Sequence, residues 1–150
     1  MILVAGIPEE RPVALVTAAL ADMGAAYRVF DQRRVMAAKL ELEIGDVSTG
    51  GAIAGTLTLQ DESIPLAEVS SMYLRTLDDR MLPGLSGLPP DAPERVRCRR
   101  FHELLSRFAD IAPGRVLNRP ADTGSNHSKP YQAQAIREAG FDIPETYITN

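Results

Sequence analysis

The residues best suited to chemistry lie between Asn118 and Lys129, in the stretch LNRPADTGSNHSKPYQAQ. Asn118 leaves a short apolar segment, and Asn126 follows within nine residues. Ser128 is a good helix N-cap and Pro130 is acceptable in a first turn, so Lys129 should project from a helix N-terminus. A cation opposes the helix dipole there, whereas an anion would be attracted by the lysine and by the unpaired N–H groups. The pattern indicates a phosphate site.

Two arginines form a second candidate site, in the segment YLRTLDDR. Arg75 ends an apolar strand and Arg80 follows in the loop. Ligands of α/β sheets bind at the carboxyl ends of strands, and a guanidinium offers a planar fork to a carboxylate or phosphate. The alternative is that Arg75 pairs with Asp78 or Asp79 and closes the loop.

A helix predicted over 94–111 carries other residues that could bind a ligand or take part in catalysis. It contains a run of arginines, namely Arg95, Arg97, Arg99 and Arg100. This run is either a solvated face beside an acidic loop or a docking surface for an acidic partner. Cys98 and His102 are four residues apart, but two residues do not make a metal site. We expect Cys98 to be packed and His102 to be solvated, and we assign no catalytic residue and no metal ligand.

The composition narrows the class of protein. The 150 residues are 45% hydrophobic and 24% charged, which is typical of a globular domain. A net charge of -4 does not favour nucleic-acid binding, which needs clustered cations. No apolar run approaches the roughly 20 residues of a membrane span, no signal peptide is recognised, and there is one cysteine. These features favour the cytoplasm and exclude a membrane partner.

The elements that position the candidates begin as β-α-β. The apolar run ILVAGI at Ile2–Ile7 predicts a strand buried on both faces. Apolar residues from Leu15 to Met23 recur at helical spacing, and a second strand follows at Ala26–Gln32. The first turn reads GIPEER, which lacks two glycines of the dinucleotide fingerprint and places two glutamates where a pyrophosphate would lie. A nicotinamide or flavin site is therefore rejected.

The middle of the chain alternates in polarity. Segments 39–45 and 53–60 predict an antiparallel hairpin with one wet face. Residues 64–69 are expected to form a turn or short helix, and 71–75 a buried strand. The loop 76–93 is rich in Pro, Gly and acids, and loops of that length are usually functional or disordered.

The remaining elements are the helix at 94–111, a strand at 115–118, a helix at 129–139 and a final strand at 143–149. The order is β-α-β-β-β-β-α-β-α-β. It predicts an α/β, Rossmann-like domain with a mostly parallel sheet and an inserted antiparallel hairpin. Residues 1–118 are expected to form this domain, and 119–150 a junction helix with the first strand of another.

The C-terminal segment SNHSKPYQAQAIREAGFDIPETYITN resembles the junction segment of ATP-grasp ligases. The likeness is to the RimK-type and graspetide ligases of the glutathione synthetase-like superfamily. Upstream, the pattern IPL-x-x-V-x-x-MYLR is similar to the strand–turn–strand of their N-terminal, pre-ATP-grasp domain. One departure is Ser128, where many members carry Asp.

The resemblance implies a substrate-binding domain of an ATP-dependent carboxylate–amine ligase, inactive as this fragment. ATP and Mg²⁺ would be held by a downstream ATP-grasp domain, so Asn150 is interpreted as a cut and no cofactor is expected in this fragment. Lys129 would reach ATP phosphate. Arg75, Arg80, Asn118 and Asn126 are the candidate contacts for a small-molecule or peptide carboxylate.

Two other functions stay open at this point. The chain could be a stand-alone module that keeps the pre-ATP-grasp shape and only binds a peptide or partner. It could also be a nucleotide-binding α/β domain that works alone, although the missing glycine loop argues against this. An exposed strand edge makes a homodimer plausible.

Overall fold

The computed structural model describes residues 1–45, 53–123, 128–145 and 147. The chain divides into two compact units, Met1–Arg119 and Pro120–Asn150. Every strand assigned among the described residues lies in the first unit. The two units are described one after the other.

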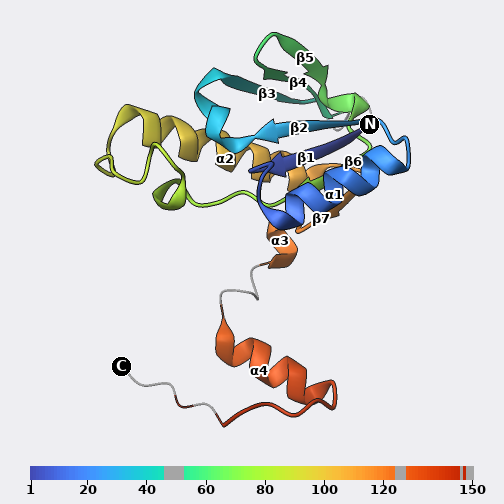
Figure 1. The fold of residues 1–150 in the computed structure, drawn as a ribbon, viewed down its shortest axis with the longest axis vertical. Helices are drawn as coiled ribbons and strands as arrows, with labels where there is room; N and C mark the ends of the chain where they lie inside the picture. Colours follow the sequence, from blue (N-terminus) through green and yellow to red (C-terminus); the bar gives the residue numbers. More distant parts are fainter. Residues whose placement is uncertain (46–52, 124–127, 146, 148–150) are drawn as a thin grey trace. The chain divides into compact units, whose positions relative to one another are not determined.

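The first unit is built on a parallel sheet with the strand order β2-β1-β6-β7 (Figure 1). The strands are β1 (Ile2–Gly6), β2 (Tyr27–Asp31), β6 (Ser71–Leu74) and β7 (Arg115–Leu117). Ile2 is paired with Tyr27 on one side of β1 and with Ser71 on the other. A central strand of this kind is buried on both faces, which explains its continuous apolar sequence. The predicted α/β fold with a mostly parallel sheet is confirmed.

Helix α1 (Arg11–Asp22) packs on one face of the sheet and α2 (Pro93–Ile111) on the other (Figure 1). The predicted apolar stripe of α1 is only partly right, because it includes Val16 and Leu20 correctly but also Leu15 and Met23. Val13 is fully buried, whereas Leu15 is 60% exposed and Met23 is 78% exposed. Since helix positions three and seven residues apart share a face, Val16 and Leu20 lie on the side of Val13 and Leu15 points away.

A second, antiparallel sheet has the order β3-β4-β5. Its strands are β3 (Ala38–Ile44), β4 (Ile53–Leu59) and β5 (Glu62–Pro65). The predicted hairpin is confirmed, with Leu40 opposite Leu57. The turn or helix expected at 64–69 is only partly right. Ile64 belongs to β5, where it pairs with Leu57 and is buried, and a 3₁₀ helix follows at Leu66–Glu68.

The core lies between the two sheets and α2. The Phe30 and Phe101 rings meet there at a centroid distance of 4.8 Å. The loop 76–93 is part of this structure, since it forms a 3₁₀ helix at Asp79–Met81 and buries Leu82 and Leu85 in the core. Burial of two leucines removes enough apolar surface from water to hold a loop in place.

The second unit contains α3 (Pro120–Thr123) and α4 (Lys129–Glu138). The Ser128 hydroxyl accepts a hydrogen bond from the Tyr131 N–H at 3.4 Å, as expected of an N-cap. The strand expected at 143–149 is absent from the residues described there, 143–145 and 147. A strand needs a neighbour for its backbone groups, and the described part of this unit offers none.

Gly55 is required by the hairpin and gives a test of the fold. Its φ is +134°, and a β-carbon there would overlap the Glu41 carbonyl oxygen. We expect Gly55→Ala to lower the free energy of unfolding of the chain by about 1–3 kcal/mol, measured by urea titration. Gly87→Ala is the matched control, since nothing lies within 4 Å of its added methyl group. Equal midpoints for the two variants would contradict this assignment.

Candidate functional site

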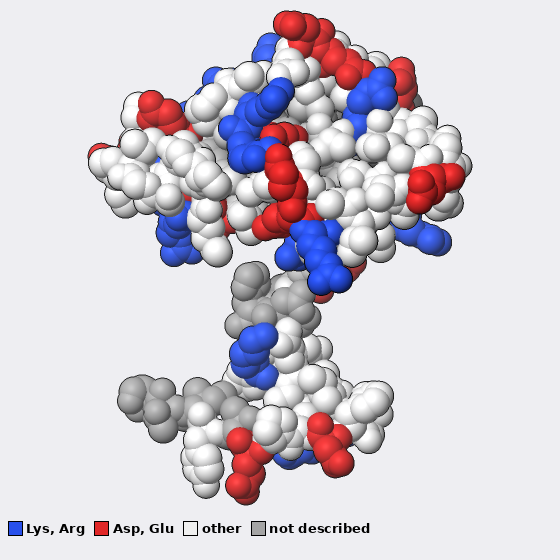
Figure 2. Space-filling model, in the orientation of Figure 1, with Lys and Arg blue, Asp and Glu red and all other residues white. Residues whose placement is uncertain are grey.

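The carboxyl ends of the parallel strands form a charged edge. The chain leaves β1 through α1 to reach β2 on one side, and it later enters β6 on the other side of β1. Such a reversal of strand order is where α/β sheets bind ligands. The side chains that follow these strands are Glu9, Glu10, Asp31, Arg33 and Arg75. Figure 2 shows acidic groups lying between basic groups over this region.

Arg75 stands at the point of reversal. Its backbone N–H donates to the Ala5 carbonyl at 2.8 Å, and its Nε donates to Glu10 Oε2 at 3.2 Å. The suggested pairing with Asp78 or Asp79 is therefore wrong, because the partner is Glu10. The Arg75 side chain is 45% exposed, so its guanidinium can meet a ligand from solvent.

The turn after β1 brings the backbone close to Arg75. A β-carbon at Gly6 would lie 2.9 Å from the Arg75 carbonyl oxygen and 3.0 Å from a Val13 methyl group. The contact with the backbone oxygen is too short for a β-carbon without a shift of the chain, and the contact with the Val13 methyl group is tight. Gly6 thus lets Glu9 and Glu10 turn back over the strand ends.

A second ion-pair cluster adjoins the first. The Arg33 Nη2 lies 2.7 Å from Asp31 Oδ2 and 2.8 Å from Glu9 Oε2. Hydrogen bonding to Arg33 lowers the pKa of Glu9. Burial raises the pKa of Asp31, but hydrogen bonds from the Arg33 side chain and backbone outweigh it and leave the pKa below its usual value. Both carboxylates are therefore ionised at neutral pH.

This cluster lines a hollow of about 340 Å³ between the end of β2 and the turn after β4. Glu9, Asp31 and Arg33 form its charged wall, and Phe30 and Leu59 contribute apolar surface. A site with fixed charges of both signs beside apolar surface suits a small amphipathic group, such as part of a peptide.

Arg80 and Asn118 are placed differently from Arg75. The Arg80 Nε donates to Asp78 Oδ1 at 2.8 Å within the same turn, and this guanidinium lowers the pKa of Asp78. Asn118 has a φ of +63° and donates from Nδ2 to the Leu74 carbonyl at 2.8 Å. Asn118 thereby ties the ends of β6 and β7 together beside Arg75, whereas Arg80 is bound to its own loop.

The other two candidates belong to the second unit. Asn126 lies outside the described residues. Lys129 is exposed, and its Nζ donates to Gln132 Oε1 at 3.0 Å rather than to a carboxylate. The predicted contact of Lys129 with phosphate stays a prediction.

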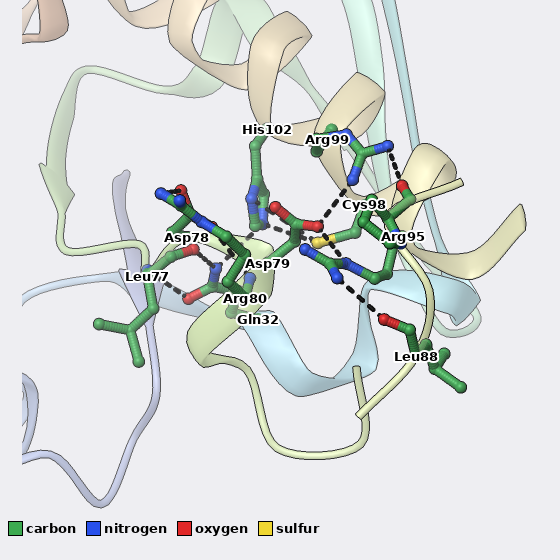
Figure 3. A network of polar contacts seen from close by, with 11 residues as sticks. Gln32, Leu77, Asp78, Asp79, Arg80, Leu88, Arg95, Cys98, Arg99 and His102 are labelled. Atoms are coloured by element: carbon green, nitrogen blue, oxygen red, sulfur yellow. Dashed lines mark hydrogen bonds and ion pairs between the residues drawn. The ribbon is translucent and has the colours of Figure 1, made fainter. Parts of the chain in front are cut away.

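A buried ion-pair network anchors the loop that follows Arg75 (Figure 3). Asp79 is 5% exposed and accepts from Arg95 Nε at 2.6 Å and from Arg99 Nη1 at 2.8 Å. Arg95 is itself 6% exposed. The solvated face expected for the arginine run is thus wrong for this side of α2. The sequence identified both the acidic loop and the arginine run, but it could not show that Asp79 forms buried ion pairs with Arg95 and Arg99.

Gln32 completes the network and was missed by the sequence analysis. Its side-chain amide donates to the Leu77 carbonyl and accepts from the Leu77 N–H, the latter at 2.8 Å (Figure 3). This pairing orients the amide nitrogen toward His102 Nε2 at 3.2 Å. His102 Nε2 must then be an acceptor, so the imidazole is neutral with its proton on Nδ1. The expectation of a solvated His102 is wrong, because it is partly buried and contacts Gln32.

Cys98 is fully buried, as expected, and lies 3.7 Å from His102 Nδ1. Burial raises the pKa of this thiol to about 11, so it is an unreactive packing residue. The described residues contain no group of three or more potential metal-ligating side chains. Within the same residues, no helix is both long and apolar enough to cross a membrane.

Comparison with known proteins relates the fold of this chain to that of solved ligases. No family model and no curated protein sequence matches the chain. Several solved structures do match the chain. The macrocyclase MdnC from Microcystis aeruginosa MRC, bound with precursor peptide MdnA, matches 97% of the chain with a TM-score of 0.71 and 23% identity. A peptide-complexed ATP-grasp ligase from Chryseobacterium gregarium matches 96% with the same TM-score and 18% identity.

The ATP-grasp ligase PsnB, complexed with minimal precursor, Mg and ADP, matches 96% of the chain with a TM-score of 0.62 and 26% identity. The match covers 44% of the MdnC chain, 42% of the Chryseobacterium ligase and 44% of PsnB, so this chain spans less than half of each. The predicted resemblance is confirmed: the fold is that found in ATP-grasp ligases associated with peptide modification.

His102 predicts a pH dependence of stability. Burial lowers the pKa of His102 below its usual 6.5, although the Asp79 and Asp78 charges oppose this. The unfolded state then binds more protons between the two values, so acid favours unfolding. We expect the free energy of unfolding to fall as pH drops below about 6.5. His102→Gln should remove this component in urea titrations between about pH 7.5 and 5.5. An unchanged pH profile in the variant would refute the neutral, partly buried imidazole.

Proposed function

We propose that this chain is the substrate-binding and orienting domain of an ATP-dependent carboxylate–amine ligase that acts on a peptide in the cytoplasm. The proposal is supported by similarity over nearly the whole chain to ligases solved with precursor peptides and with ADP. ATP and Mg²⁺ would be bound by an ATP-grasp domain that follows these residues. The carboxylates of the charged edge, Glu9, Glu10 and Asp31, are engaged with arginines and are not proposed as metal ligands.

The observation that carries the proposal is the Arg75–Glu10 pair at the reversal of strand order. Only the Arg75 Nε contacts Glu10 in the described residues, so the terminal nitrogens of the guanidinium can bind an incoming carboxylate. A substrate carboxylate held there would be oriented before it meets ATP, which is a large part of catalysis in reactions of two substrates.

The reaction would have two steps. A carboxylate oxygen attacks the γ-phosphorus of ATP, and ADP leaves as the acyl phosphate forms. The amine nitrogen then attacks the acyl carbon, phosphate leaves, and the amine loses a proton. This chain would contribute orientation and exclusion of water from the acyl phosphate. Its charged edge would hold the peptide, while the phosphates would be stabilised elsewhere.

The test is ADP formation by the protein made from the complete reading frame that contains these residues. Synthetic peptides that carry Asp or Glu together with Lys serve as substrates, with ATP and Mg²⁺. Product peptides should lose one water for each ADP formed, as measured by mass spectrometry. Peptide binding without any ADP would instead support the stand-alone binding module.

Arg75→Ala tests the carboxylate contact in the same protein. Loss of a charge-assisted pair worth about 1.5–3 kcal/mol should raise KM for the peptide at least about tenfold, with KM for ATP unchanged. Arg28→Ala is a matched control, since Arg28 is 48% exposed and makes a single ion pair, with Glu62. A lower melting temperature for Arg75→Ala with unaltered kinetics would mean that Arg75 only fastens the turn after β1.

Lys129 is proposed to contact ATP phosphate. It lies at the N-terminus of α4, where a cation is unfavourable by about 0.3–1 kcal/mol without an anion. Lys129→Ala should therefore weaken ATP binding in the complete ligase and slightly stabilise α4 in its absence. Titration calorimetry with ATP and urea titration measure the two effects, and Lys39→Ala is the control. Intact ATP affinity together with a less stable fold would exclude this role.

A further inference from the structure

Helix α2 and the outer strand β3 enclose a groove distinct from the charged edge. The groove has a volume of about 470 Å³. Leu40, Phe101 and Leu104 supply its apolar floor. β3 lies at the outside of the antiparallel sheet, and α2 packs against it (Figure 1).

The rim of the groove carries charges of one sign. Lys39, Arg97 and Arg100 line it, and no acidic residue does among those that the structure describes. Arg97 donates to the Ala38 carbonyl at 3.2 Å, and no described carboxylate forms an ion pair with it. Lys39 contacts Glu41 at 2.8 Å, but both side chains are more than half exposed, so this pair is weak.

The arginines on the two sides of α2 differ in whether they form ion pairs. On the core side, Arg95 and Arg99 are both paired with Asp79. On the groove side, Arg97 and Arg100 have no ion pair among the described residues. An anionic partner in the groove would pair with these two charges.

The backbone of β3 offers a second means of recognition. Alternate residues of an edge strand direct their N–H and C=O groups away from the sheet, and an extended peptide can pair with them. The Ala38 carbonyl already faces α2, since it accepts from Arg97. By the alternation of the strand, Leu40 and Leu42 present their backbone groups to the same side.

We propose that this groove binds an extended acidic segment of another polypeptide, which adds as a strand to β3. Its alternate apolar side chains would pack on Phe101 and Leu104, and its carboxylates would face Arg97 and Arg100. Peptides recognised in this way gain affinity from the backbone and specificity from the side chains. The proposal does not rest on the ligase function, since the groove and the charged edge use different strands.

The probe is a fluorescein-labelled octapeptide of alternating Glu and Val, and the readout is fluorescence anisotropy with the 150-residue chain. We expect saturable binding that weakens with added salt. Arg97→Glu and Arg100→Glu should each raise the dissociation constant at least about tenfold, by loss of one ion pair and gain of a repulsion. Arg11→Glu makes the same charge change at an exposed site on α1 and should leave binding intact.

Two further peptides test separately whether binding requires negative charge and whether it requires backbone hydrogen bonds. A Lys–Val octapeptide should not bind, and a Glu–Val octapeptide that is N-methylated at alternate residues should bind at least about tenfold more weakly. Equal binding of either peptide would overturn the proposal, as would equal losses in Arg11→Glu and Arg100→Glu. Sedimentation that shows a dimer abolished by Arg100→Glu would also overturn it, because the occupant would then be a second copy of the chain.

Discussion

The buried carboxylate of Asp79 is the contact on which much of the first unit depends. An ion at this depth is tolerated only when it is paired, and Asp79 is paired with two arginines of α2. These bonds bind the loop 76–93 to the helix, and the Gln32 amide binds the start of that loop to the end of β2. Removal of the Asp79 carboxylate would leave the Arg95 charge buried without its ion pair, which typically costs about 3–5 kcal/mol.

This constraint controls the charged edge of the sheet. Arg75 lies between β6 and the anchored loop. Both segments constrain its backbone and thereby the direction in which its side chain leaves the strand. On the opposite side of the reversal, Gly6 allows the turn after β1 to approach closely enough for Glu10 to reach Arg75. The pair is exposed and weakly held, which suits a guanidinium that exchanges one carboxylate for another.

The arginines of α2 have two different roles, because some lie on the side of the helix that faces Asp79 and others on the side that faces β3. Those that face Asp79 hold the fold, while those that face β3 carry charge that the described residues do not neutralise. The same short segment therefore stabilises the core and creates the basic rim of the groove. A substitution in this run is expected to affect stability or binding according to the side on which it falls.

The sequence by itself determined most of the elements and their order, although β5, α3 and the absence of a strand at 143–145 were not predicted. The apolar run of β1, the alternation of β3 and β4, and the capped helix α4 are local patterns, and local backbone preferences suffice to predict them. The position of Arg75 at a strand end was predicted for the same reason, as was the burial of Cys98.

Only the tertiary structure decided which charges meet. Glu10 and Arg75 are 65 residues apart, Asp79 and Arg95 are 16 apart, and Gln32 and His102 are 70 apart. Each pairing depends on how the strands are ordered and on which way the loop 76–93 folds, and neither leaves a periodic signal in the sequence. The same limit explains the error at Leu15: several faces of α1 are apolar, and contact with the sheet selected the one that contains Val13.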